Sequence, residues 1–210
     1  RNMLANAQLI SDRLAGVPDP TVQRFVPKLI ASLDRAITFC NSSLSFGKAE
    51  EAAPRRELVP LAPLVEEVGD GLGLPRDGQI AWRVDMPSTL LIDADREHLL
   101  RILSNLVRNA VQALETAEPR VPGSITVTGR REGRRVLVEV SDSGPGLPPR
   151  ARAGLFQAFK GSSKKGGTGL GLTIAAELAA AHGGRLTLLE RTPGATFLLD
   201  IPDRPTRADG

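Results

Sequence analysis

The sequence predicts an α+β protein, in which a helical hairpin at residues 1–50 is followed by an α/β sandwich domain at residues 58–203. Apolar residues recur at three- and four-residue spacing through the first fifty positions, whereas helical and strand patterns alternate after position 58. The chain of 210 residues is 41% hydrophobic, which is enough for one medium domain and a smaller one. Because only 3% of residues are aromatic, the core must be aliphatic.

The composition excludes several classes of protein. With 27 basic and 24 acidic residues the net charge is only +3, and aromatic stacking platforms are scarce, so we expect no nucleic-acid partner. The single cysteine, Cys40, excludes a disulfide framework within one chain and fits a reducing compartment. No apolar run reaches the roughly 18 residues of a membrane span, so we expect no membrane contact by this chain. The first residue is Arg1 rather than Met, which indicates a piece of a longer protein.

The first fifty residues predict two helices. Apolar residues at 4–14 form a short helical pattern, Gly and Pro at 16–20 break it, and a longer apolar stripe runs over 22–44. A hairpin cannot bury both stripes alone, so we expect a homodimeric four-helix bundle through residues 1–50. The alternative is a hairpin packed on the rest of its own chain.

A linker is expected at 51–57, and a polar tail at 204–210, with fraying after Pro202. Between them the patterns predict helices at 61–68, 95–117 and 170–182, strands at 80–84, 90–92, 124–129, 136–141, 185–189 and 196–201, and a partly helical segment at 147–159.

The helix expected at 95–117 has two distinct faces. Its core face carries Leu99, Leu103, Leu106, Ala110 and Leu114. Asn105, Arg108, Asn109 and Gln112 fall on roughly the opposite face, at three- or four-residue spacing. Asparagine is a mediocre helix former, so two in register suggest amides offered to a ligand or to a hard cation such as Mg²⁺. Two ordinary surface asparagines are the alternative.

A second motif follows the strand at 136–141. The strand delivers Asp142 to its end, and Gly144 and Gly146 come directly after it. Glycines there let a flat ligand approach the backbone, and a carboxylate can accept a hydrogen bond from an exocyclic amine such as that of adenine. An ordinary turn is the alternative, because Asp-Ser-Gly is common turn chemistry.

A third motif is the glycine-rich run from Gly161 to Gly171, directly before a helix. Backbone amides at a helix N-terminus bind anions, and Lys164 and Lys165 add positive charge, so the run reads as a phosphate-binding lid. The Gly-Lys-Ser/Thr order of a P-loop is absent. A flexible linker is the alternative.

In this order and spacing, the motifs resemble the catalytic ATP-binding domain of sensor histidine kinases, which belong to the Bergerat-fold ATPases, over about residues 58–202. The resemblance implies Mg-ATP as ligand, with Asn109 binding the metal, Asn105 as its catalytic partner, and Asp142 holding the adenine amino group. Phe156 and Phe159 would hinge and anchor the lid. The remaining positions implied to bind the cofactor are Arg108, Gln112, Gly144, Gly146, Phe159, Lys164, Gly167, Thr168, Gly169, Leu170, Gly171 and Thr196.

Two positions depart from patterns within this group. Gln112 stands where many relatives carry a basic residue that reaches the phosphates, so either Arg108 compensates or the phosphate contact is weaker. ATP-hydrolysing relatives carry Glu where this chain has Asn105, and an amide cannot take a proton at neutral pH. The resemblance therefore implies phosphoryl transfer rather than hydrolysis.

The hairpin resembles the dimerisation and phosphotransfer domain of the same kinases. Residues 1–4, Arg-Asn-Met-Leu, match the second half of its signature, which places the acceptor histidine three residues before Arg1. Asn2 falls on the polar position implied to orient water in dephosphorylation of the response regulator. Met3 replaces the usual proline, so the first helix should lack the family's kink.

The implied function is that of the cytoplasmic portion of a sensor histidine kinase, which passes phosphate from ATP to the upstream histidine and then to a response-regulator receiver domain. Whether the parent protein is anchored in the inner membrane stays open. The alternatives are a pseudokinase or phosphatase scaffold that binds a response regulator, and a hydrolytic Bergerat-fold ATPase. His98 and His182 are expected to be structural, and the arginines at 130–131 and 134–135 to form a solvated rim.

Overall fold

The computed structural model describes residues 53–75, 79–117, 122–147, 152, 154–156, 170–191 and 193–204. The helical hairpin expected at residues 1–50 lies outside this part of the chain.

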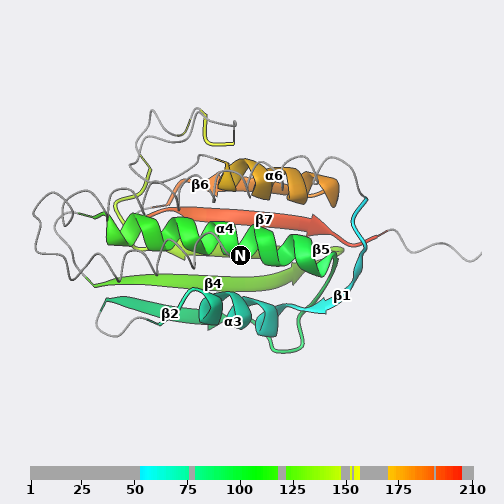
Figure 1. The fold of residues 1–210 in the computed structure, drawn as a ribbon. Helices are drawn as coiled ribbons and strands as arrows, with labels where there is room; N and C mark the ends of the chain where they lie inside the picture. Colours follow the sequence, from blue (N-terminus) through cyan, green and yellow to red (C-terminus); the bar gives the residue numbers. More distant parts are fainter. Residues whose placement is uncertain are drawn as a thin grey trace, which may run out of the picture.

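After a first strand, the described elements repeat as one helix followed by two strands (Figure 1). In chain order they are β1 (Glu57–Pro60), α3 (Leu61–Gly71), β2 (Ile80–Asp85), β3 (Leu91–Ala94), α4 (Arg96–Glu115), β4 (Gly123–Glu132), β5 (Arg135–Asp142), α6 (Gly171–Ala181), β6 (Arg185–Leu189) and β7 (Thr196–Pro202).

The strands form two sheets. The larger has the order β2-β4-β5-β7-β6, in which β2 and β4 are parallel and the other neighbours antiparallel. The smaller is the antiparallel pair of β1 and β3. β5 is the central strand of the larger sheet, so the end of β5, where Asp142 lies, has β4 on one side and β7 on the other.

The molecule has two layers, because α3, α4 and α6 lie over the same face of the larger sheet (Figure 1). Side chains alternate between the two faces of a strand, and Val136, Val138 and Val140 of β5 are fully or almost fully buried under the helices. Among the described residues, the buried hydrophobic side chains are aliphatic apart from Phe197, as the composition predicts. No helix in the described part of the chain is both long and apolar enough to span a membrane.

The opposite face of the sheet carries buried carboxylates that are each held by two arginines. Glu139 accepts from Arg130 at 2.8 Å and from Arg191 at 2.6 Å. Asp200 is paired in the same way, at 2.6 Å with Arg135 and at 3.4 Å with Arg185. Of the arginines predicted to form a solvated rim, Arg130, Arg131 and Arg135 are therefore ion-paired, and Arg134 is exposed and donates to Arg204 O.

Two expectations about the ends of the domain need correction. The predicted linker at 51–57 overlaps a strand, because β1 begins at Glu57 and pairs with β3. The fraying expected after Pro202 does not occur at the next two residues. Asp203 donates its amide to Arg134 O at 2.9 Å, and Arg204 donates its amide to Asp93 Oδ2 at 3.0 Å.

Candidate functional site

Helix α4 forms the base of the candidate site. Asp95 caps its start, because Asp95 Oδ1 accepts the amide of His98 at 3.1 Å. The core face predicted from the sequence is confirmed: Leu99, Leu103, Leu106, Ala110 and Leu114 are all buried. On the other face Asn105 and Asn109 are half-buried, whereas Arg108 and Gln112 are exposed.

Asp142 is a buried carboxylate at the end of β5, only 7% exposed. Its Oδ1 accepts the amide of Gly144 at 2.8 Å and that of Ala195 at 3.4 Å. The backbone of the two segments is also joined, since Asp142 donates its amide to Ala195 O at 3.0 Å. Hydrogen bonds to Oδ1 fix the orientation of this carboxyl group before any ligand arrives.

Three glycines, Gly144, Gly146 and Gly194, surround Asp142, and we call them the glycine wall. Gly194 has φ +86° and Gly146 has φ +73°, a conformation that other residues adopt only with strain. A Cβ atom on Gly194 would lie 1.7 Å from Asp142 O, and one on Gly146 would lie 2.8 Å from Gly194 O. The surface beside Asp142 must therefore be bare backbone.

The glycine wall adjoins the last turn of α4. A Cβ atom on Gly144 would meet Ala113 Cβ at 3.5 Å and Leu114 Cδ2 at 3.6 Å. The strand end that carries Asp142 and the helix that carries the two asparagines are thus in contact.

The first residue of α6 lies against Asn105. A Cβ atom on Gly171 would be 3.2 Å from Asn105 Oδ1, which is tighter than an ordinary van der Waals contact. Leu170, directly before it, is buried in the core. The helix N-terminus that follows the glycine-rich run is thus in contact with the asparagine face of α4.

One face of α4 connects these two regions. Asn105 touches the start of α6, Ala113 lies beneath the glycine wall, and Asn109 lies between them, one helical turn from each. Eight residues of helix separate the two ends, which is about 12 Å. The described parts of the three sequence motifs therefore lie along one helix face.

The donor set along this face fits Mg²⁺ only in partnership with a ligand. Among the described residues no group of three or more His, Cys, Asp or Glu side chains could hold a metal ion. Magnesium, however, keeps several waters and commonly takes one or two protein oxygens together with substrate phosphates. The half-buried Asn109 amide, one helical turn beyond Asn105, offers such an oxygen.

The structure does not bring Thr196 to the side chain of Asp142. Thr196 pairs in register with Ser141, and their hydroxyl oxygens lie 3.0 Å apart. Because consecutive strand residues face opposite ways, Ser141 and Thr196 lie on the other face of the sheet from the Asp142 side chain. In place of Thr196, it is the amide of Ala195 that reaches the carboxylate.

Several predicted site residues lie outside the described part of the chain. They are Asn2, Phe159, Lys164, Gly167, Thr168 and Gly169. Phe156 is described and packs, half-buried, against the core. Gly194, which the sequence reasoning did not select, completes the glycine wall. Its signal was available in the Pro-Gly pair directly before the last strand.

The two histidines pack together near the start of α4, where His98 lies seven residues before Asn105. Their rings meet edge to face at 5.5 Å. Burial lowers the pKa of His182, so this ring is neutral near pH 7. His182 therefore cannot stabilise α6 as a cation at its C-terminus; it does so through hydrogen bonds of the neutral ring.

Comparison with known protein families gives a match to a profile described as "Histidine kinase-, DNA gyrase B-, and HSP90-like ATPase". The match covers residues 94–205, which is more than half of the chain. It includes α4, the glycine wall and α6.

Among curated relatives, the sensor protein TorS of Escherichia coli (strain K12) is 34% identical over 98% of this chain and 22% of its own length. The chain spans between 22% and 56% of the length of the first curated relatives that it matches.

Two solved structures are similar across almost the whole chain. Full-length ShkA in complex with AMPPNP is 31% identical with a TM-score of 0.66, over 96% of this chain and 45% of that one. Histidine kinase ThkA in complex with response regulator protein TrrA is 26% identical with a TM-score of 0.72, over 98% of this chain and 60% of that one.

Proposed function

Since the chain belongs to the family of histidine kinase-, DNA gyrase B- and HSP90-like ATPases, with sensor histidine kinases among its relatives, we propose that it binds Mg-ATP along the asparagine face of α4 and donates the γ-phosphoryl group to a histidine. The observation that carries this proposal is the contact of α4 with the glycine wall at one end and with the start of α6 at the other.

The adenine would lie at the glycine wall. Asp142 Oδ1 is occupied by two backbone amides, which orients the carboxylate so that it can accept a hydrogen bond from the exocyclic amine. Bare backbone at Gly144, Gly146 and Gly194 lets the flat base approach closely. Adenine would therefore be recognised by the Asp142 carboxylate and by the backbone of three glycines whose positions leave no space for a side chain.

The triphosphate would run along α4 toward α6. Its anionic end would meet the helix N-terminus at Gly171, where free amides and the helix dipole favour negative charge. Asn109, midway along the face, would hold the metal, which neutralises phosphate charge when bound. Lys164 and the glycines at 167 and 169 would complete the phosphate contacts, and Phe159 would anchor the lid.

Asn105 distinguishes phosphoryl transfer from hydrolysis. Its side chain lies against Gly171, at the end of the face where the phosphates would be. An amide can orient a group by hydrogen bonds but cannot accept a proton from water at neutral pH. The chain's residues would then act by positioning the γ-phosphoryl group and excluding water, and the acceptor would supply the nucleophile.

The acceptor in the full protein would be a histidine three residues before Arg1, and the phosphoryl group would pass from it to an aspartate of a response-regulator receiver domain. Residues 1–50 would dimerise and bind that regulator. Asn2 would orient the water that dephosphorylates the regulator in a phosphatase reaction. That ThkA forms a complex with the regulator TrrA supports this choice of partner.

The binding site is tested by alanine variants of the 210-residue chain. Asn109→Ala and Asp142→Ala should each weaken Mg-ATP binding by at least about tenfold, because contacts of this kind contribute about 1.5–3 kcal/mol. Isothermal titration with AMPPNP and MgCl₂ measures the affinity. Asp85→Ala is the matched control, since Asp85 also ends a strand but is exposed and forms an ion pair with Arg83. Unchanged affinity in both site variants would contradict the assignment.

Transfer is tested separately from binding. The chain extended upstream through the expected histidine should acquire radiolabel from γ-labelled ATP in a bond that is labile to acid and stable to base, while free phosphate release stays low. If the extended chain binds ATP but only releases phosphate, the hydrolytic alternative holds. If it binds a response regulator and never labels, the scaffold alternative holds.

A further inference from the structure

A second contact joins α4 and α6 at the end of the helices away from the glycine wall. His182 directly follows α6 and is only 2% exposed. Its Nδ1 lies 2.7 Å from Leu178 O and its Nε2 lies 3.0 Å from the amide nitrogen of Asp95. A carbonyl only accepts and an amide only donates, so the ring carries its proton on Nδ1 and accepts at Nε2. His182 thus ties the carboxyl end of α6 to the capping residue of α4.

The two helices therefore run side by side in opposite directions and are joined at two points. Ten residues of α4 separate Asp95 from Asn105, about 15 Å, and eleven residues of α6 separate Gly171 from His182, about 16 Å. The lengths match, because Asp95 contacts His182 and Asn105 contacts Gly171. A helix is stiff along its axis, so a shift at one contact must appear at the other.

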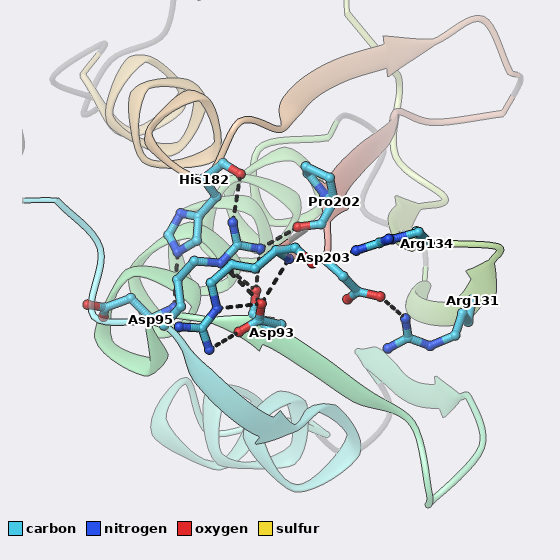
Figure 2. A network of polar contacts seen from close by, with 9 residues as sticks. Asp93, Asp95, Arg131, Arg134, His182, Pro202 and Asp203 are labelled. Atoms are coloured by element: carbon cyan, nitrogen blue, oxygen red, sulfur yellow. Dashed lines mark hydrogen bonds and ion pairs between the residues drawn. The ribbon is translucent and has the colours of Figure 1, made fainter. Parts of the chain in front are cut away.

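The segment that precedes β1 is bonded to the same joint, by which we mean the contact of His182 with Asp95. Figure 2 shows these two residues in one polar network with Asp93 and Pro202. Arg56 donates to His182 O at 3.2 Å, to Asp93 O at 2.6 and 3.0 Å, and to Pro202 O. Arg55 donates its amide to Asp95 Oδ2 at 2.8 Å. With its side chain only 12% exposed, Arg56 closes the joint from the side on which the chain enters the domain.

We propose that His182 is a positioning residue of the nucleotide site, which sets the axial register of α6 on α4 and thereby the spacing of Gly171 and Asn105 at the other end. The proposal rests on the proposed function, because it assigns a role in the binding of ATP. Arg55 and Arg56 make the preceding segment part of the same joint. Nucleotide binding near Gly171 and Asn105 is then coupled to the stability of the His182–Asp95 contact. The coupling is reciprocal, so each favours the other.

Three variants of the 210-residue chain separate positioning from simple packing. His182→Phe keeps a ring against His98 and removes both hydrogen bonds. His182→Gln keeps an acceptor that can reach the Asp95 amide. His98→Phe is the matched control, since it changes the neighbouring histidine of the same ring pair and leaves the Asp95–His182 bond in place.

Affinity for AMPPNP with MgCl₂, measured by isothermal titration, should fall about five- to tenfold in His182→Phe, within the range of typical couplings between sites. It should stay within about twofold of the unaltered chain in His182→Gln and in His98→Phe. Equal affinity in all four proteins would overturn the proposal, as would a loss in His182→Gln as large as that in His182→Phe.

A measurement on the unaltered chain keeps the proposal testable if His182→Phe does not fold. Saturating AMPPNP should slow hydrogen exchange of the Asp95 and Arg55 amides at least several-fold, although both lie at the far end of α4 from the glycine wall. A purely structural joint would give no such response, and unchanged exchange at both amides would overturn the inference while the binding site stands. Absence of AMPPNP binding to the unaltered chain would instead remove the proposed function itself.

Discussion

At the scale of single residues, the surroundings of Asp142 are set by positions that carry no side chain. Gly194 combines φ +86° with a Cβ position 1.7 Å from Asp142 O, so both strain and collision oppose any other residue there. The carboxylate is oriented by amides of Gly144 and Ala195, which do not depend on side-chain identity. Substitution of the glycine should therefore disturb the carboxylate more than substitution of its neighbours.

Gly194→Ala tests this against a matched glycine. Gly73 also has positive φ, +67°, but a Cβ there meets nothing within 4 Å. Gly73→Ala should cost about 1–2 kcal/mol from backbone strain alone, and Gly194→Ala should cost at least about 2 kcal/mol more, with loss of AMPPNP binding. Urea unfolding measures both free energies. Equal losses of unfolding free energy in the two variants would mean that the structure accommodates the added methyl group beside Asp142 O at no cost.

Single residues are also where prediction from the sequence was least secure. Asp142, Asn105 and Gly171 were assigned to one site from the family resemblance that the order and spacing of the three motifs carry. Thr196 was predicted from the resemblance to bind the cofactor, but the strand register turns its side chain to the opposite face of the sheet from the Asp142 side chain, because a shift of one residue in a strand reverses the direction of a side chain. That one-residue register is set by pairing with Ser141, a contact that spans 55 residues of sequence.

At the scale of elements, α4 and α6 work as a pair. Gly171, the first residue of α6, faces Asn105. A methyl group added at Gly171 would place its carbon only 3.2 Å from Asn105 Oδ1. Alanine is the better helix former by about 1 kcal/mol. Stability and binding should therefore respond in opposite directions to one substitution.

Gly171→Ala should leave the free energy of unfolding unchanged or raise it by up to about 1 kcal/mol, while AMPPNP affinity falls because the Asn105 amide is displaced. In an Asn105→Ala background the added methyl group has nothing to displace, so the further loss of affinity should vanish. Isothermal titration of the four proteins of this double-mutant cycle measures the interaction. Additive losses would show that the two residues do not act on each other.

The elements themselves were predicted unequally. The stripe of α4 was readable because eight buried residues repeat at the helical period over twenty positions. β1 was missed because four residues, Glu-Leu-Val-Pro, carry too short a pattern and become a strand only through β3, more than thirty residues later. Long periodic elements are encoded locally, whereas short edge strands depend on distant partners.

At the scale of the whole molecule, buried ionisable groups set the response to acid. Burial raises the pKa of Asp93, but hydrogen bonds from Arg204 and the charge of Arg56 outweigh it and hold that pKa below its usual value. The pKa of Glu139 is lowered in the same way, against burial, by Arg130 and Arg191. Burial lowers the pKa of His182 below its usual value.

Stability should therefore decline in two stages as the pH falls. Below about 6.5 the unfolded chain protonates His182 while the folded chain resists, and below about 4 the same holds for the carboxylates, since all three pKa values are lower in the folded state. His182→Gln should abolish only the upper stage. Urea unfolding between pH 8 and pH 3 measures both stages. An identical upper decline in the variant would assign it to another group.

Asp93 has a consequence for the architecture of any protein that contains this domain. Its carboxylate receives Arg56, near the point where the chain enters, and Arg204, near the point where it leaves. The two ends of the described domain therefore lie close together on the same side of it. Insertion of such a unit into a surface loop of a host protein should not force the loop apart. A short peptide joining residue 204 to residue 53 should allow circular permutation, with new termini opened elsewhere on the surface.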